Sequence, residues 1–167
     1  MNGRKKPRVP RWPARLDTIS LATGRAGKLF DYEVNHIIGQ TNAGMDALRE
    51  GRATEHDWSM VAGMLNAALH VNAGGVAVVL DDVLEDAEAI VNALWQRATT
   101  TGTWRAPILR GPEIEAIQTA IRAHKWQLQQ LSQGEALAAL QHAEANVRRQ
   151  GGLVTHSYHT THPGATA

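Results

Sequence analysis

The chain has 167 residues, of which 43% are hydrophobic and 20% are charged, proportions that exclude a largely disordered protein and suit one globular domain with tails. The absence of cysteine excludes disulfides, a thiolate nucleophile and zinc sites with sulfur ligands. The net charge of +1 hides a division, because the first fifteen residues carry six positive charges and no acid, which leaves eleven positive against sixteen negative charges on residues 16–167.

Residues 1–15 form a basic N-terminal arm. Its three prolines exclude a continuous helix, so we expect an extended or flexible segment. Clustered Lys and Arg displace counterions from phosphates, and an aromatic ring among them can stack on a base. The same composition also suits a solubilising tail. The candidate nucleic-acid-binding residues are Arg4, Lys5, Lys6, Arg8, Arg11, Trp12 and Arg15.

Residues 16–152 are predicted to form a single helical domain, which begins with a poorly defined segment. Between residues 16 and 29, two glycines interrupt a weak apolar pattern, so a short helix or a loop is expected. After Asp31, a candidate N-cap, apolar residues recur on one side as far as Gly51. This pattern predicts a helix.

Two further helices have clear start signals. Thr54 and Asp57 are spaced as in a capping box, and the helix that follows them is expected to end at the glycines 74–75. An acidic segment from Asp81 suits the positive end of a helix dipole. A helix is therefore predicted from there to a break at residues 99–103.

The last two predicted helices carry the most regular patterns. Pro112 suits the first turn of a helix, and the apolar stripe that follows consists of Ile114, Ile117, Ile121, His124, Leu128 and Leu131. Ser132 and Glu135 form a capping box that opens the last helix. We expect this helix to bury Leu137, Leu140, Ala143 and Val147.

The fold class predicted from these patterns is all-α, because no segment alternates as a strand does. We expect a compact bundle of five or six helices. A flexible basic N-terminal arm precedes the bundle, and a polar C-terminal tail, residues 153–167, follows it.

The histidines offer two candidate sites. His156, His159 and His162 lie in the tail at a spacing that can bind a transition metal, but a tail that merely contains histidines is the preferred interpretation. His124 is either a general base or ligand in a cleft, or a core residue. Because no nucleophile or paired carboxylate can be placed beside it, we expect it to be buried, neutral and hydrogen-bonded. No enzyme activity, catalytic residue, resident metal or cofactor is predicted.

Tryptophan is unusually common, with five Trp against one Phe. Trp104 and Arg105 lie on a predicted loop, where the ring either clamps the last two helices to the core or contacts a partner. Trp126 lies opposite the apolar stripe of its helix, four residues after Arg122. This placement suits a cation–π pair, packing on another helix, or a partner-binding hot spot. The candidate partner-binding residues are Trp104, Arg105, Arg122 and Trp126.

Two stretches between residues 53 and 150 resemble a group of small helical proteins from proteobacterial chromosomes, prophages and plasmids. They read ATEHDWSMVAGMLNAAL and TGTWRAPILRGPEIEAIQTAIRAHKWQLQQLS. Some members are labelled Fis-type transcriptional regulators, so the resemblance implies a DNA-binding role. The last helix begins with Gln133 and Glu135 and becomes basic only at Arg148, unlike a recognition helix. We therefore expect mainly phosphate-directed and largely sequence-independent binding.

The sequence thus predicts a non-enzymatic, DNA-associated accessory or regulatory protein of a mobile element, whose arm binds phosphates. The alternative is a protein-interaction module that docks a host or phage partner. No apolar stretch approaches the roughly 18 residues that cross a bilayer, and no apolar segment follows the basic start as in a signal peptide. We expect no membrane partner and a cytoplasmic location.

Overall fold

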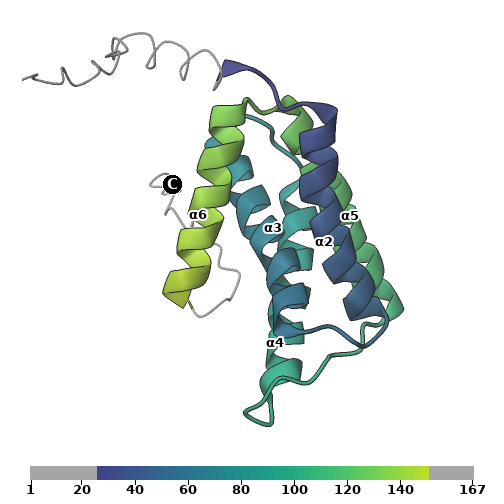
Figure 1. Ribbon diagram of the computed structural model, residues 1–167. Coiled ribbons are helices and arrows are strands. Elements are labelled where there is room, and N and C mark those ends of the chain that lie inside the picture. The colour runs from purple at the N-terminus through teal and green to yellow at the C-terminus, as the bar shows by residue number, and fades with distance from the viewer. Residues whose placement is uncertain (1–25, 151–167) are drawn as a thin grey trace, which may run out of the picture.

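The computed structural model describes residues 26–150, which form a bundle of helices (Figure 1). The predicted all-α bundle is confirmed, and a single antiparallel bridge between Lys28 and Ser132 is the one β-type pairing in this range. The arm, residues 1–15, and the tail, residues 153–167, lie outside the described residues. The described residues contain five helices: α2 (Asp31–Arg49), α3 (Glu55–Gly74), α4 (Asp81–Thr99), α5 (Gly111–Gln130) and α6 (Gln133–Gln150).

Helix α3 is the centre of the bundle. It contacts each of the other four helices, whereas α6 packs chiefly on α3, at the side of the bundle (Figure 1). Half of the residues of α3 are buried, as expected for a helix that is apolar on nearly all sides. The predicted stripe of α5 is also buried at Ile117, Ile121, His124 and Leu128.

The predicted starts of α3 and α6 are confirmed. Thr54 Oγ1 accepts a hydrogen bond from the Asp57 N–H at 3.2 Å, and the Asp57 carboxylate accepts one from the Thr54 N–H at 2.8 Å. Ser132 and Glu135 make the same reciprocal pair at 3.3 and 2.8 Å. The hydrogen bonds from Thr54 and Ser132 lower the pKa of the Asp57 and Glu135 carboxyls.

The predicted N-cap of α2 is wrong by one residue. The helix begins at Asp31, so the N-cap is Phe30, whose backbone N–H donates to the Glu33 carboxylate at 2.8 Å. Phenylalanine has no side-chain acceptor to complete the reciprocal pair. Propensity favours aspartate at an N-cap, but the carboxylate of Glu33 satisfies the backbone there instead.

The buried face of α6 also differs from the prediction. Leu137 and Leu140 are 43% and 40% exposed, although both were expected inside. The side chains that α6 buries are small or polar, and three alanines allow it to lie close to α3. The leucines are consequently displaced to the edge of the interface, and the side chain of Val147 lies outside the described part. The buried residues are Ala136, Ala139, Ala143 and Asn146.

Helices α2 and α3 approach each other closely at Gly44. A Cβ atom added at this position would lie 2.5 Å from the carbonyl oxygen of Asp57 and 3.5 Å from Cβ of Met60. Carbon and oxygen atoms without a bond between them do not approach to 2.5 Å. Glycine is therefore required here by the contact between the helices.

We expect Gly44→Ala to lower the free energy of unfolding by about 1–3 kcal/mol, because the added methyl group overpacks the contact with α3. The control is Gly39→Ala in the same helix, where a Cβ meets no atom within 4 Å. That change should stabilise the protein by about 0.5–1 kcal/mol, since glycine disfavours a helix interior. Urea unfolding followed by circular dichroism measures the free energy of unfolding of both variants. Equal changes in Gly44→Ala and Gly39→Ala would contradict the close approach of α2 and α3 at Gly44.

Candidate functional site

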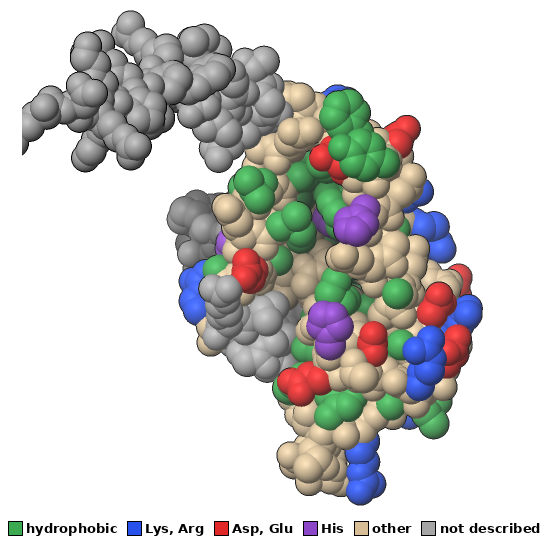
Figure 2. Space-filling model, in the orientation of Figure 1, with side chains coloured by type: hydrophobic (Ala, Val, Ile, Leu, Met, Phe, Trp, Pro, Cys, Tyr) green, Lys and Arg blue, Asp and Glu red, His purple; other side chains and the backbone are tan. Residues whose placement is uncertain are grey.

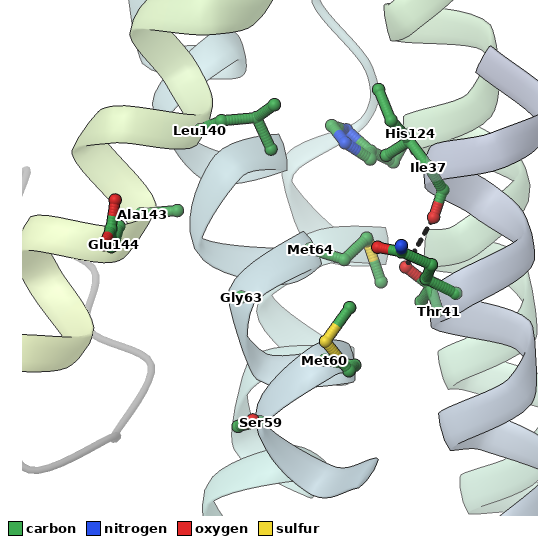
Figure 3. Close-up of a pocket in the computed structure, with 11 residues that line it drawn as sticks. Ile37, Thr41, Ser59, Met60, Gly63, Met64, His124, Leu140, Ala143 and Glu144 are labelled. Carbon is green, nitrogen blue, oxygen red and sulfur yellow. Dashed lines mark hydrogen bonds between the residues drawn. The ribbon is translucent and has the colours of Figure 1, made fainter. Parts of the chain in front are cut away.

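A pocket of about 420 Å³ lies between α2 and α6, with α3 as its floor (Figure 3). On the face shown in Figure 2, hydrophobic side chains surround a hollow in the surface. The volume is in the range of small-molecule pockets, roughly 300–1,000 Å³. Residues that line the pocket include Ile37 and Thr41 of α2, Met60, Gly63 and Met64 of α3, and Leu140 of α6.

The lining is mainly hydrocarbon and thioether. Met60 and Met64 lie on the floor, and their unbranched side chains can adapt to molecules of different shape. Leu140 is available as a wall because α6 buries alanines against α3 in its place. The pocket therefore suits a predominantly apolar molecule.

His124 of α5 lines the same pocket, between Leu140 and Ile37 in the view of Figure 3. The imidazole is 1% exposed, and its Nδ1 lies 2.9 Å from Oε1 of Gln127. Burial lowers the pKa of His124, and the weaker effect of the Gln127 hydrogen bond opposes this. The predicted buried and hydrogen-bonded histidine is confirmed, and its low pKa keeps the ring neutral at pH 7.

The second ring nitrogen of His124 has no hydrogen-bond partner in the described part of the chain. Nε2 is buried, and no donor or acceptor between residues 26 and 150 reaches it. Buried polar atoms without a partner are uncommon in folded proteins. His124 is thus the polar feature of the pocket that packing alone does not explain.

Trp104, a predicted partner-binding residue, lies in a cluster of tryptophans. Its Nε1–H donates to the carbonyl oxygen of Ala53 at 2.8 Å, and its ring centroid lies 5.8 Å from that of Trp95 and 6.4 Å from that of Trp58. The ring is thus held against the core at α3 and α4; a clamp on the last two helices and contact with a partner both stay predictions. Arg105, the next residue, is exposed.

Arg122 and Trp126 lie in the second half of α5. Arg122 Nη2 donates to Oγ1 of Thr119 at 2.8 Å, and Trp126 is 46% exposed. The loop with Trp104 precedes the first turn of α5, a helix about 30 Å long at 1.5 Å per residue (Figure 1). Arg122 and Trp126 thus lie more than one helical turn beyond the loop, and partner binding at the four predicted residues stays a prediction.

Other predicted sites fall on segments outside the described residues. They comprise the arm, with Arg4, Lys5, Lys6, Arg8, Arg11, Trp12 and Arg15, and the tail with His156, His159 and His162. These predictions remain untested. No helix described between residues 26 and 150 is long and apolar enough to cross a membrane.

Sequence reasoning missed the pocket because its residues come from four helices. Leu140 was assigned to the core, and the methionines lie on a helix that is apolar nearly all round. One signal was available: Gly63 lies in the middle of a strongly predicted helix, where glycine is unfavourable. A Cβ at Gly63 would meet no atom within 4 Å.

No protein-family model matches the chain, and no curated protein or solved structure matches it either. The resemblance to the group of small proteobacterial helical proteins consequently stays a prediction.

The low pKa of His124 predicts a loss of stability in mild acid. Because the folded pKa lies below the unfolded value of about 6.5, the unfolded chain binds the proton more readily. The free energy of unfolding should therefore be highest above about pH 6.5 and fall as the pH decreases towards the folded pKa. The slope for this one proton is at most about 1.4 kcal/mol per pH unit.

Urea unfolding between pH 5 and pH 7.5 measures this dependence in the unaltered chain and in His124→Gln, which cannot titrate. We expect a flatter profile in the variant. His70→Gln is the matched comparison, since burial and the charge of His142, whose ring is stacked 4.0 Å away, also lower the pKa of His70. If the free energy of unfolding of His124→Gln depends on pH as steeply as that of the unaltered chain, His124 is not the group responsible for the loss of stability in acid.

Proposed function

We propose that the helical domain is a non-enzymatic binding module that holds a small, mainly apolar molecule between α2, α3 and α6. The observation that carries this proposal is the apolar pocket of about 420 Å³ with one buried polar ring, His124, in its lining. A well-formed apolar pocket with few polar groups is typical of ligand sites. The apolar surface supplies affinity, and the polar group supplies orientation.

The volume indicates how large a part of a ligand the pocket can hold. A protein cavity of about 150 Å³ holds benzene, and this pocket has nearly three times that volume. A bicyclic aromatic compound or a branched alkyl compound of similar size therefore fits. At about 0.6 kcal/mol per heavy atom, within the range for small ligands, such a compound of about ten heavy atoms has a Kd on the order of 10–100 μM.

A bound molecule would also connect helices that otherwise have little contact. Helix α6 packs chiefly on α3, so a ligand between Leu140 and Ile37 adds a contact between α6 and α2. A ligand that binds only the folded chain stabilises it by mass action. Occupancy of the pocket therefore controls how firmly α6 is held, which suits an accessory or regulatory protein.

Filling the pocket tests this proposal. Gly63 lines the pocket, and a Cβ there meets no atom within 4 Å, so Gly63→Leu should fold and place its side chain in the pocket. We expect at least a tenfold loss of affinity for 2-methoxynaphthalene, measured by fluorescence titration. Gly39→Leu is the matched control, because Gly39 is an exposed glycine of α2 outside the pocket lining, and it should bind as the unaltered chain does.

Equal binding by the unaltered chain and Gly63→Leu would place the probe elsewhere. Absence of binding to the unaltered chain would overturn the proposal. Circular dichroism and urea unfolding establish that both glycine variants are folded. We expect Gly63→Leu to be at least as stable as the unaltered chain, since it replaces a glycine inside a helix.

A second function, association with DNA, is proposed from the charges of the arm. Six of the seventeen Lys and Arg residues lie within residues 1–15, whereas the remaining residues are net acidic. Contacts between such an arm and phosphates depend little on base sequence. The arm would supply the affinity, and the acidic remainder would limit non-specific contact by the helical domain.

Deletion of residues 2–15 tests DNA association. We expect the deletion to weaken binding to duplex DNA, because it removes all six cations of the arm. Each phosphate contact contributes about 0.9 to the slope of log K against log salt, so the slope should decrease by up to about 5. Fluorescence anisotropy at several salt concentrations measures it, and an unchanged slope would exclude the arm as the binding element.

A further inference from the structure

Gln127 determines which nitrogen of His124 carries the proton. The Gln127 side chain is fully buried, and its Nε2 donates to the carbonyl oxygens of Ala68 at 3.3 Å and Ala77 at 3.1 Å. An amide nitrogen has two hydrogens, and both are used by these carbonyls. The amide oxygen therefore faces His124, and because this oxygen can only accept, Nδ1 of His124 must donate.

This tautomer leaves Nε2 with a lone pair. In a neutral imidazole one nitrogen donates and the other accepts, so Nε2 of His124 is a hydrogen-bond acceptor. Nε2 has no partner in the described part of the chain, and the ring belongs to the lining of the pocket (Figure 3). A ligand that supplies a hydrogen-bond donor would satisfy this atom.

We propose that the pocket selects apolar molecules with one uncharged hydroxyl group, a phenol or an alcohol, which donates a hydrogen bond to Nε2 of His124. This inference rests on the proposed function, since it presupposes that an apolar molecule binds in the pocket. An ether or a ketone offers no proton and leaves Nε2 unsatisfied. A carboxylate brings negative charge into an apolar site, past Glu144 in the lining, which is unfavourable.

Thr41, also in the lining, is a second acceptor to consider. Its hydroxyl donates to the carbonyl oxygen of Ile37 at 3.5 Å, one turn earlier. A hydroxyl has a single proton to donate, so while this bond persists Oγ1 of Thr41 can only accept and would also favour a ligand hydroxyl over an ether. Nε2 is itself buried, so a ligand reaches it only when side chains of the lining move; Met60 and Met64 of this lining are unbranched and change rotamer readily. A preference for donors identifies His124 only if it persists in Thr41→Val.

The test compares 2-naphthol with 2-methoxynaphthalene on the full chain by isothermal titration calorimetry. The two compounds share a ring system, but the ether cannot donate and is the more hydrophobic. We expect 2-naphthol to bind about tenfold more tightly, which corresponds to 1.4 kcal/mol and is the size of a hydrogen bond to a buried group. Thr41→Val should retain this preference, and His124→Phe should lose it.

The outcomes separate the two proposals. Equal affinities for the two compounds overturn the selection of a hydroxyl group and leave the binding of apolar molecules standing. A lack of binding to either compound overturns both. Loss of the preference in Thr41→Val assigns the hydrogen bond to Thr41 and overturns the role of His124.

Nitrogen-15 NMR of the imidazole provides a measurement that does not depend on the folding of a variant. In the full chain at pH 7, we expect His124 to carry its proton on Nδ1, and its Nε2 resonance to shift on addition of 2-naphthol but not of 2-methoxynaphthalene. A proton on Nε2 in the free protein overturns the inference. An Nε2 resonance that 2-naphthol leaves unchanged overturns it as well.

Discussion

The buried side chain of Gln127 joins the core to the pocket. Its amide nitrogen links α5 to Ala68 in α3 and to Ala77 in the segment between α3 and α4, while its oxygen orients His124. The carbonyl of Ala77 lies outside any helix, so this bond holds the connection against α5. Loss of the amide would leave two carbonyls and an imidazole without these bonds in the interior, where each unsatisfied group costs about 1–3 kcal/mol.

The pocket follows from the way in which α2 and α6 contact α3. Helix α2 approaches α3 closely at Gly44, and α6 does so through a stripe of alanines, with Asn146 donating to Asn66 at 2.7 Å. These contacts hold the two helices on different sides of α3. The strip of α3 between them, with Met60 and Met64, is left as the floor of the pocket. The small residues at both interfaces bring α2 and α6 close to α3, and the larger side chains beside them line the pocket that remains between α2 and α6.

Local sequence signals predicted the helices. The features that they did not predict depend on packing between helices. The capping residues Thr54 and Ser132 act within four residues, so their patterns are readable from the sequence. In α6 an alanine stripe and a leucine stripe lie side by side, and hydrophobicity alone favoured the wrong one. The burial of His124 was predictable from its helical position. The orientation of its ring was not, because the carbonyls that fix Gln127 lie 59 and 50 residues away in the sequence.

Two features that lower stability coincide at the pocket. Gly63 costs about 1 kcal/mol relative to alanine in a helix, and packing does not require it, since a Cβ there meets no atom within 4 Å. Gly44, by contrast, is required by a close contact. His124 adds a buried acceptor without a partner among the described residues, at a stripe position where leucine would bring none. Departures from the rules of stable packing concentrate at functional sites. Because Gly63 and His124 both line the same pocket, they favour a binding role for this pocket over a defect of the core.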